Sequence, residues 1–365
     1  MRWNHLALIL FISFLEIFTH FGAIAPDSKH FFNASYFFLG VRDFPSNPVG
    51  IVRPLLPFLA SFLTPFLSLP IAYALINSML YPLSGVVCYK LSEKITGSST
   101  ISLISSVMLL TSFSMVSYGA SAYYMGVAIF FELLAAFLAF KIGESVIAAL
   151  LIGLLSGIGA LAGEAVLIYV GFGFILWIIR RKFSNALIYL VVALLPPMLI
   201  PSMLGCSLID FYFRLNIEYA RSLGLLTPSY WFNIFRRITL LAAGLSLLDL
   251  AGLFTGFLIE RDGSRIKLFY LMFGLALLAW FCWVPSERRH VYIFYPSVQW
   301  MSAIGVYWIA ERLGEKPLLR FLDSKMWLVI LLLVNAILTN GLSYAWYLEG
   351  NLKGIGPIPG FSLPV

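Results

Sequence analysis

Long apolar runs recur along this chain at the length of membrane-crossing helices. A helix that crosses the hydrocarbon core of a bilayer needs about 20 mostly apolar residues. Eleven candidate runs of roughly this length can be marked: Leu6–Ala25, Pro70–Tyr89, Ile101–Tyr118, Ser121–Phe140, Val146–Leu161, Ala165–Ile179, Ala186–Leu204, Ile238–Leu258, Leu268–Val284, Val291–Ala310 and Met326–Ala345. The pattern predicts an all-α membrane protein, a polytopic helical bundle of about 11 transmembrane helices.

Two of the connections between these runs are long. The first, Pro26–Leu69, is half apolar and contains two short aromatic and aliphatic stretches, at 30–39 and 54–63. Both are too short to span, which is typical of helices lying in the membrane interface. The second connection, Gly205–Arg237, mixes charged and aromatic residues. No repeat or linker divides the chain, so we expect residues 1–365 to form a single integral-membrane domain.

The composition agrees with a membrane protein. The chain is 61% hydrophobic and 11% charged, whereas an ordinary soluble domain has about 25% charged residues. So few charges cannot cover a water-facing surface, which excludes a soluble enzyme or a nucleic-acid-binding module. The three cysteines are scattered without the spacing of a zinc site or a disulfide framework.

The basic residues predict the orientation. With the amino terminus in the cytoplasm, 14 of the 24 lysines and arginines lie inside, and Arg180-Arg181-Lys182 is the firmest anchor. The other ten lie outside, mainly in 26–53, 205–237 and 285–290. The long aromatic loops then share the extracytoplasmic face.

Asp27 is the first charged residue after the first run, and four roles are open for it. A carboxylate just above the membrane can act as a general base, or it can be an ordinary solvated loop acid. A magnesium-type metal site needs several oxygen ligands, and no second carboxylate follows two residues on. A proton relay with Glu16 and His20, which lie on the first run itself, would suit a transporter.

The order of the sequence elements resembles that of the polytopic C-type glycosyltransferases. The outer-face acid Asp27 is followed by an aromatic stretch and then by a stretch opening with Arg53-Pro54. Gly163-Glu164 is similar to an acid-containing turn of that superfamily, and the 289–296 segment, Arg-His-Val-Tyr-Ile-Phe-Tyr-Pro, is similar to a late basic-aromatic motif. The resemblance covers most of residues 1–310, with 1–204 as the shared module and 205–365 as a variable outside loop and further spans.

One departure from that superfamily concerns a second acid. Members often carry one in the outside turn between the third and fourth spans, but here the turn Tyr118–Met125 has none. We therefore expect no metal and no other cofactor. The same departure leaves open that the chain is an inactive relative.

The outer-face cations have a reason to exist if a phosphate is held there. Arg288, Arg289 and His290 form a compact cluster, and guanidinium groups grip phosphate oxygens with two hydrogen bonds. Lipid headgroups would be held by the same groups. Within the runs, Glu132 and Asp249 are costly in hydrocarbon and should face the bundle interior.

The resemblance implies an inverting membrane glycosyltransferase that moves a sugar from a polyprenyl- or dolichyl-phosphate carrier to a hydroxyl of a lipid, glycan or protein acceptor. It implies Asp27 as the catalytic base and a substrate-binding set of Arg53, Glu164, Arg288, Arg289 and His290. The site would face the extracytoplasmic side of a plasma membrane or endoplasmic reticulum. A secondary transporter, a lipid flippase and a non-catalytic membrane subunit are the alternatives.

Overall fold

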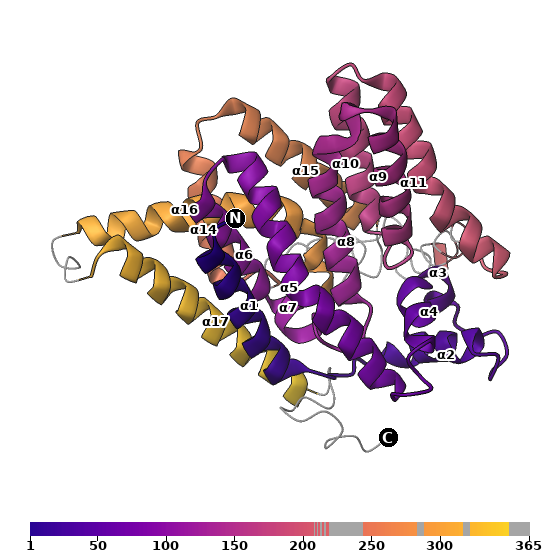
Figure 1. The fold of residues 1–365 in the computed structure, drawn as a ribbon. Coiled ribbons are helices and arrows are strands. Elements are labelled where there is room, and N and C mark those ends of the chain that lie inside the picture. The colour runs from indigo at the N-terminus through magenta and orange to yellow at the C-terminus, as the bar shows by residue number, and fades with distance from the viewer. Residues whose placement is uncertain are drawn as a thin grey trace.

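The computed structural model describes residues 1–207, 244–282, 288–316 and 322–349, together with positions 209, 211, 214, 217 and 218. Throughout these ranges the regular secondary structure is helical, which confirms the all-α class. In chain order the helices are α1 (Trp3–His20), α2 (Ser28–Phe38), α3 (Val49–Val52), α4 (Leu55–Ser61), α5 (Leu69–Thr96), α6 (Ser99–Leu110), α7 (Phe113–Tyr118), α8 (Met125–Leu138), η1 (Ala139–Glu144), α9 (Val146–Ala160), α10 (Val166–Ile179), α11 (Phe183–Met203), α14 (Leu247–Ile259), α15 (Gly263–Cys282), η2 (Arg288–Phe294), α16 (Tyr295–Glu315) and α17 (Ser324–Leu348). Figure 1 shows their arrangement.

Each of the eleven apolar runs lies wholly or partly on one or more of these helices. Within the described residues, six helices are long and apolar enough to cross a membrane. Four apolar helices are shorter: α6, α9, α10 and α14. The chain is therefore an integral membrane protein, and the number of eleven crossings stays a prediction.

The third run breaks in two where the sequence predicts one helix. α6 ends at Leu110 and α7 begins at Phe113. The Tyr81 hydroxyl donates a hydrogen bond of 2.5 Å to the carbonyl of Leu110, and the Thr111 hydroxyl donates one to the carbonyl of Val107. Side-chain hydroxyls thus pair with backbone carbonyls at the end of α6. The helix can therefore end inside the buried core without leaving these carbonyls unpaired.

α5 organises the side of the bundle on which the first long loop lies. Three buried polar residues, Tyr73, Asn77 and Tyr81, recur every four residues and therefore share one face of the helix. Tyr73 donates to the carbonyl of Phe31 at 2.9 Å, and the Asn77 amide donates to the carbonyls of Ser121 and Tyr123 at 2.7 and 2.6 Å. One helix face thereby fixes the first long loop and the turn before α8.

The two predicted interfacial stretches are helical, as α2 and α4, and Figure 1 shows them grouped with α3 beside the start of α5. α2 is joined to α4 through Ser35, whose hydroxyl donates to the carbonyl of Pro57 at 2.9 Å. Phe58 and Phe62, near the end of this group, are 44% and 62% exposed. Such an amphipathic arrangement suits a membrane surface, although the depth of these helices stays a prediction.

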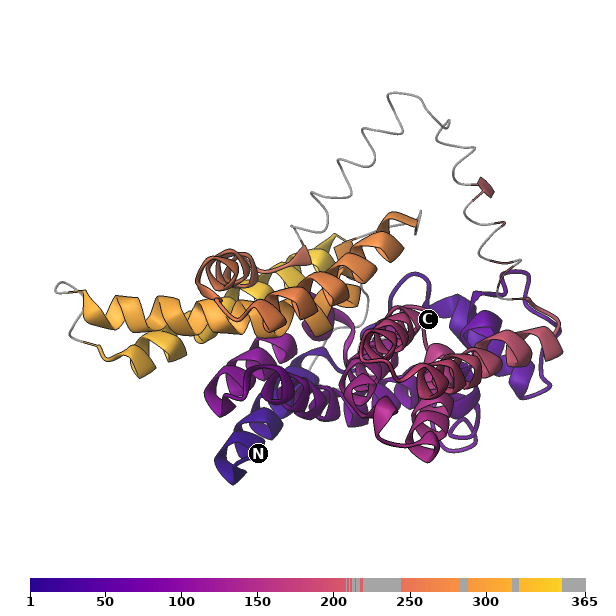
Figure 2. The same cartoon turned by 90° about the horizontal axis from the view of Figure 1, so that it is seen from above.

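The later helices lie against the earlier ones, as Figure 2 shows for the layer of α14–α17. Within this layer α14 and α16 cross very closely. A Cβ atom added to Gly305 would lie 1.9 Å from the carbonyl oxygen of Gly252 and 2.5 Å from the nitrogen of Gly256. Small residues of this kind let membrane helices pack backbone to backbone. Residues before and after position 204 share one hydrophobic core. The division of the chain into a shared module, 1–204, and a variable remainder, 205–365, stays a prediction.

The orientation leads to a labelling prediction. In a chain whose native cysteines are replaced, we expect a membrane-impermeant thiol reagent to label Asp27→Cys in intact cells. Arg181→Cys, at the turn between α10 and α11, should react only after the cells are permeabilised. Reaction of Arg181→Cys but not of Asp27→Cys in intact cells would reverse the topology.

Candidate functional site

Asp27 stands at the start of α2, in a loop that is paired with another loop. The N–H of Gly22 donates to the carbonyl of Ala120 at 3.2 Å, and that of Ala122 donates to the carbonyl of Ala23 at 2.7 Å. Gly22 has φ of 79°, a left-handed conformation that suits glycine. The turn in which the superfamily often carries a second acid thus contributes backbone here and fixes the segment before Asp27.

Asp27 is half-buried and occupies the cap position of α2 without a side-chain capping bond. Its carboxylate acts on His30, one turn later. Burial lowers the pKa of His30, and the negative charge of Asp27 works in the opposite direction. The position is compatible with a base that meets water and an acceptor.

Arg53 and Glu164, which separate sequence motifs predict as substrate-binding residues, form a bidentate ion pair. The Arg53 Nε donates to Glu164 Oε2 at 2.7 Å, and Nη2 donates to Oε1 at 2.6 Å. Arg53 follows α3 and is 5% exposed, and Glu164 lies in the turn between α9 and α10. The N–H of Leu55 donates to the carbonyl of Leu161 at 3.1 Å, which brings the two backbones together. Charge-assisted forks of this kind are strong and directional.

An aromatic cluster connects this pair with α2 and η2. The Arg53 guanidinium lies 4.4 Å from the ring centre of Tyr124, and Phe31 stacks on the same ring at 5.1 Å. The hydroxyls of Tyr124 and Tyr292 are 3.5 Å apart. Phe31 lies one turn after Asp27, so the predicted base and the ion pair belong to one packed unit. The sequence showed the tyrosines of the turn but not this stacking.

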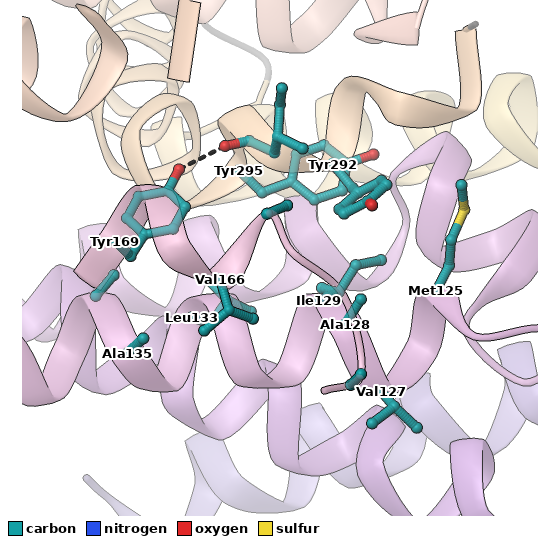
Figure 3. Close-up of a cluster of buried hydrophobic side chains, with 14 of the residues drawn as sticks. Met125, Val127, Ala128, Ile129, Leu133, Ala135, Val166, Tyr169, Tyr292 and Tyr295 are labelled. Atoms are coloured by element: carbon teal, nitrogen blue, oxygen red, sulfur yellow. Dashed lines mark hydrogen bonds between the residues drawn. The ribbon is translucent and has the colours of Figure 1, made fainter. Parts of the chain in front are cut away.

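A cleft of about 90 Å³ opens beside Glu164. Its lining is mostly apolar: Glu164, Ala165, Ile168, Ala279, Trp280, Tyr292 and Ile293. The Tyr169 hydroxyl donates to the carbonyl of Ile293 at 2.5 Å and so joins α10 to η2, as Figure 3 shows. Ligand pockets are typically 300–1,000 Å³, so this cleft is smaller than a typical ligand pocket.

The cationic cluster lies at the start of η2, the helix that lines one side of the cleft. Arg288, Arg289 and His290 are the first residues of η2, and Tyr292 and Ile293 of the same helix line the cleft. The side chains of these three residues lie outside the described part of the chain. Their contact with a phosphate therefore stays a prediction.

The buried acids of the spans differ in their partners. Asp249 caps α14 together with Ser246, in a reciprocal capping box, and Glu16 accepts a hydrogen bond of 3.1 Å from Asn340. Glu132 is fully buried, as expected for an acid facing the bundle interior. Asp249 is not among the residues of the cleft. Among the described residues there is no group of three or more histidines, cysteines and acids able to hold a metal ion.

Comparison with known proteins identifies the fold but no near relative. No protein-family profile matches the sequence, and no curated protein does. The oligosaccharyltransferase of Archaeoglobus fulgidus in its apo form matches with a TM-score of 0.58 at 12% identity over the whole chain, which spans 62% of its length. ArnT from Cupriavidus metallidurans in the apo state matches with a TM-score of 0.54 at 12% identity, over 95% of this chain and 73% of its own.

Two further solved structures hold lipid phosphates. One is the archaeal oligosaccharyltransferase AglB of A. fulgidus in complex with an inhibitory peptide and a dolichol-phosphate, with a TM-score of 0.56 at 12% identity over 100% of this chain and 61% of that one. The other is ArnT bound to undecaprenyl phosphate, with a TM-score of 0.51 at 12% identity over 96% and 72%. The resemblance in the order of the sequence elements is thus confirmed at the level of the fold: the chain has the fold of the polytopic C-type glycosyltransferases.

Proposed function

We propose that this protein is a membrane glycosyltransferase that moves a sugar from a polyprenyl-phosphate or dolichyl-phosphate carrier to an acceptor hydroxyl at the extracytoplasmic face. The acceptor is a lipid, a glycan or a protein. The reaction inverts the anomeric centre and uses no metal.

The observation that carries this proposal is the convergence of four separate segments. Asp27 with α2, the Tyr124 turn, the Arg53–Glu164 pair and η2 form one unit through the contacts described above. The fold is shared with proteins solved with dolichol-phosphate and undecaprenyl phosphate. The carboxylate of Asp27 can serve as a base and the cationic residues 288–290 can hold a phosphate, as transfer from a lipid phosphate requires. The cleft beside Glu164, at about 90 Å³, must widen to admit the sugar.

In this mechanism Asp27 takes the proton of the acceptor hydroxyl as its oxygen attacks the anomeric carbon. The bond from that carbon to the phosphate oxygen breaks, and its electron pair leaves with the lipid phosphate. Arg288 and Arg289 stabilise the charge that develops on the leaving group, and such electrostatic stabilisation is usually the largest single catalytic effect. Attack from the face opposite the phosphate inverts the centre.

Lipid-phosphate binding tests the proposal without an acceptor. A ligand that binds only the folded state stabilises it, and the stabilisation grows with the ratio of ligand concentration to Kd. We expect undecaprenyl phosphate, but not undecaprenol at the same concentration, to raise the Tm of the purified protein in detergent. Equal effects of the two lipids would indicate a general lipid effect and would count against a phosphate site.

Arg289 provides a further prediction. Lysine keeps the charge but loses the planar fork of the guanidinium group. We expect Arg289→Lys to lower turnover more than it weakens donor affinity, because the contact strengthens as the leaving group gains charge, with Arg288→Lys milder. Donor-saturation kinetics on both variants and on the double variant measure this. Unchanged turnover and affinity in all three would make the cluster a lipid-headgroup anchor.

A further inference from the structure

Glu132 is the buried acid that the proposed mechanism leaves unused. It lies on α8, is 0% exposed, and neither of its carboxyl oxygens has a hydrogen-bond partner within the described part of the chain. Buried polar groups are normally paired, and an isolated buried charge is especially costly. An ionisable residue kept in a span at such a cost is a functional candidate by default. The neutral acid is the form that this environment tolerates.

The position of Glu132 relates it to the ion pair. Ala128 and Glu132 are four residues apart and so lie on the same face of α8. A Cβ atom added to Gly163 would be 3.0 Å from the Cβ of Ala128, so this face of α8 packs on the turn that carries Glu164. α8 also packs on α10, which begins two residues after Glu164.

Among the described residues, Glu132 is in no ion pair. Figure 3 shows the buried cluster of side chains from α8, α10 and η2, which includes the apolar residues Ile129, Leu133 and Val166. In this cluster the Tyr169 hydroxyl donates to the carbonyl of Ile293. Arg53 gives two hydrogen bonds to Glu164. A neutral carboxylic acid can donate one hydrogen bond. The packing of α8 on the turn at Gly163 makes the Glu164 carboxylate the candidate acceptor for that bond, once Arg53 no longer occupies it.

We propose that Glu132 is a positioning residue that donates a hydrogen bond to the Glu164 carboxylate when the Arg53 guanidinium turns from Glu164 to an anionic group entering the cleft. The substitute partner keeps Glu164 from being left buried and unpaired, which lowers the cost of releasing Arg53. This step rests on the proposed function for the identity of the anion, a lipid phosphate. Its first half, the exchange of partners at Glu164, does not.

Two variants separate this role from a purely structural one. Glu132→Leu removes the donor and also removes the unpaired polar atoms from an apolar setting, so we expect its Tm to equal or exceed that of the wild type. Glu132→Gln keeps a donor group and serves as the matched control. If Glu132→Leu instead lowers the Tm as much as a core disruption does, and Glu132→Gln does not restore it, the residue is structural and the proposal is wrong.

The exchange at Glu164 is tested without any lipid by a double-mutant cycle on thermal stability. Arg53→Met leaves Glu164 without its guanidinium in every background. We expect the fall in Tm caused by Arg53→Met to be larger in the Glu132→Leu protein than in the wild-type or Glu132→Gln protein, because only the latter two can supply a donor. Equal falls in the three backgrounds would overturn the partner exchange.

Binding of undecaprenyl phosphate then tests the coupling to the ligand. We expect Glu132→Leu to weaken it about tenfold or more, the factor for one hydrogen bond to a charged group, and Glu132→Gln to stay near the wild type. If the wild type binds undecaprenyl phosphate and Glu132→Leu binds it with the same affinity, the coupling is overturned. If the wild type does not bind the lipid, the proposed function fails and the coupling fails with it, while the stability cycle still decides the exchange at Glu164.

Discussion

Asp27→Asn should lower sugar transfer by about 10²–10⁴-fold, the usual loss when a general base is removed. Asparagine keeps the size and the hydrogen-bonding ability of the side chain but cannot take a proton at neutral pH. Donor binding and Tm should stay close to those of the wild type, because the substitution keeps the shape of the side chain and removes only its basicity. Transfer rates of the purified variant at saturating donor measure the effect.

Asp43→Asn is the matched control. Asp43 is an exposed acid of the same long loop, so it tests whether any loss of negative charge near α2 slows the reaction. We expect its transfer rate to be unchanged. Wild-type transfer by Asp27→Asn, or an equal loss in the two variants, would show that Asp27 is not the base.

The second large effect concerns the Arg53–Glu164 pair. Removing one partner of a buried ion pair leaves an uncompensated charge and costs about 3–5 kcal/mol. We expect Glu164→Ala to destabilise the protein by this amount, since the side chain of Arg53 is only 6% exposed and that of Glu164 only 17%. Thermal unfolding in detergent measures the loss.

The same pair should behave non-additively. Replacing both partners of a buried pair by apolar residues is often close to neutral, so Arg53→Met combined with Glu164→Leu should recover most of the stability lost in Glu164→Ala. The exposed pair Lys141–Glu144, at 2.9 Å, is the control: Lys141→Met should change stability by at most about 1 kcal/mol. Losses at Arg53 and Glu164 that simply add would contradict the pair as a stabilising unit.

Much of the fold follows from the spacing of apolar residues. The runs predict where helices form, because burial in hydrocarbon leaves the helix as the structure that satisfies every backbone group. They do not predict where a helix stops inside the core. The break after Leu110 depends on a hydroxyl from Tyr81, 29 residues away in the sequence, and only the packed structure brings the two together.

The candidate site divides in the same way. Arg53 and Glu164 were each chosen from local motifs, and their ion pair joins residues 111 apart. The stacking of Phe31 on Tyr124 and the approach of Tyr292 depend on three-dimensional packing that a local pattern does not contain. The capping box of Ser246 and Asp249 could be predicted from the sequence, because a serine three residues before an acid is a recognised capping signal.

The most direct test of glycosyl transfer is to follow the sugar itself. Membranes containing the wild-type protein or Asp27→Asn would be incubated with radiolabelled polyprenyl-phosphate sugars, and the products extracted and separated from the donor. We predict that label moves from the carrier to a new acceptor in the wild type and stays on the carrier in Asp27→Asn. Label that remains on the carrier in both, or that crosses the membrane of sealed vesicles while still attached to it, would contradict the account.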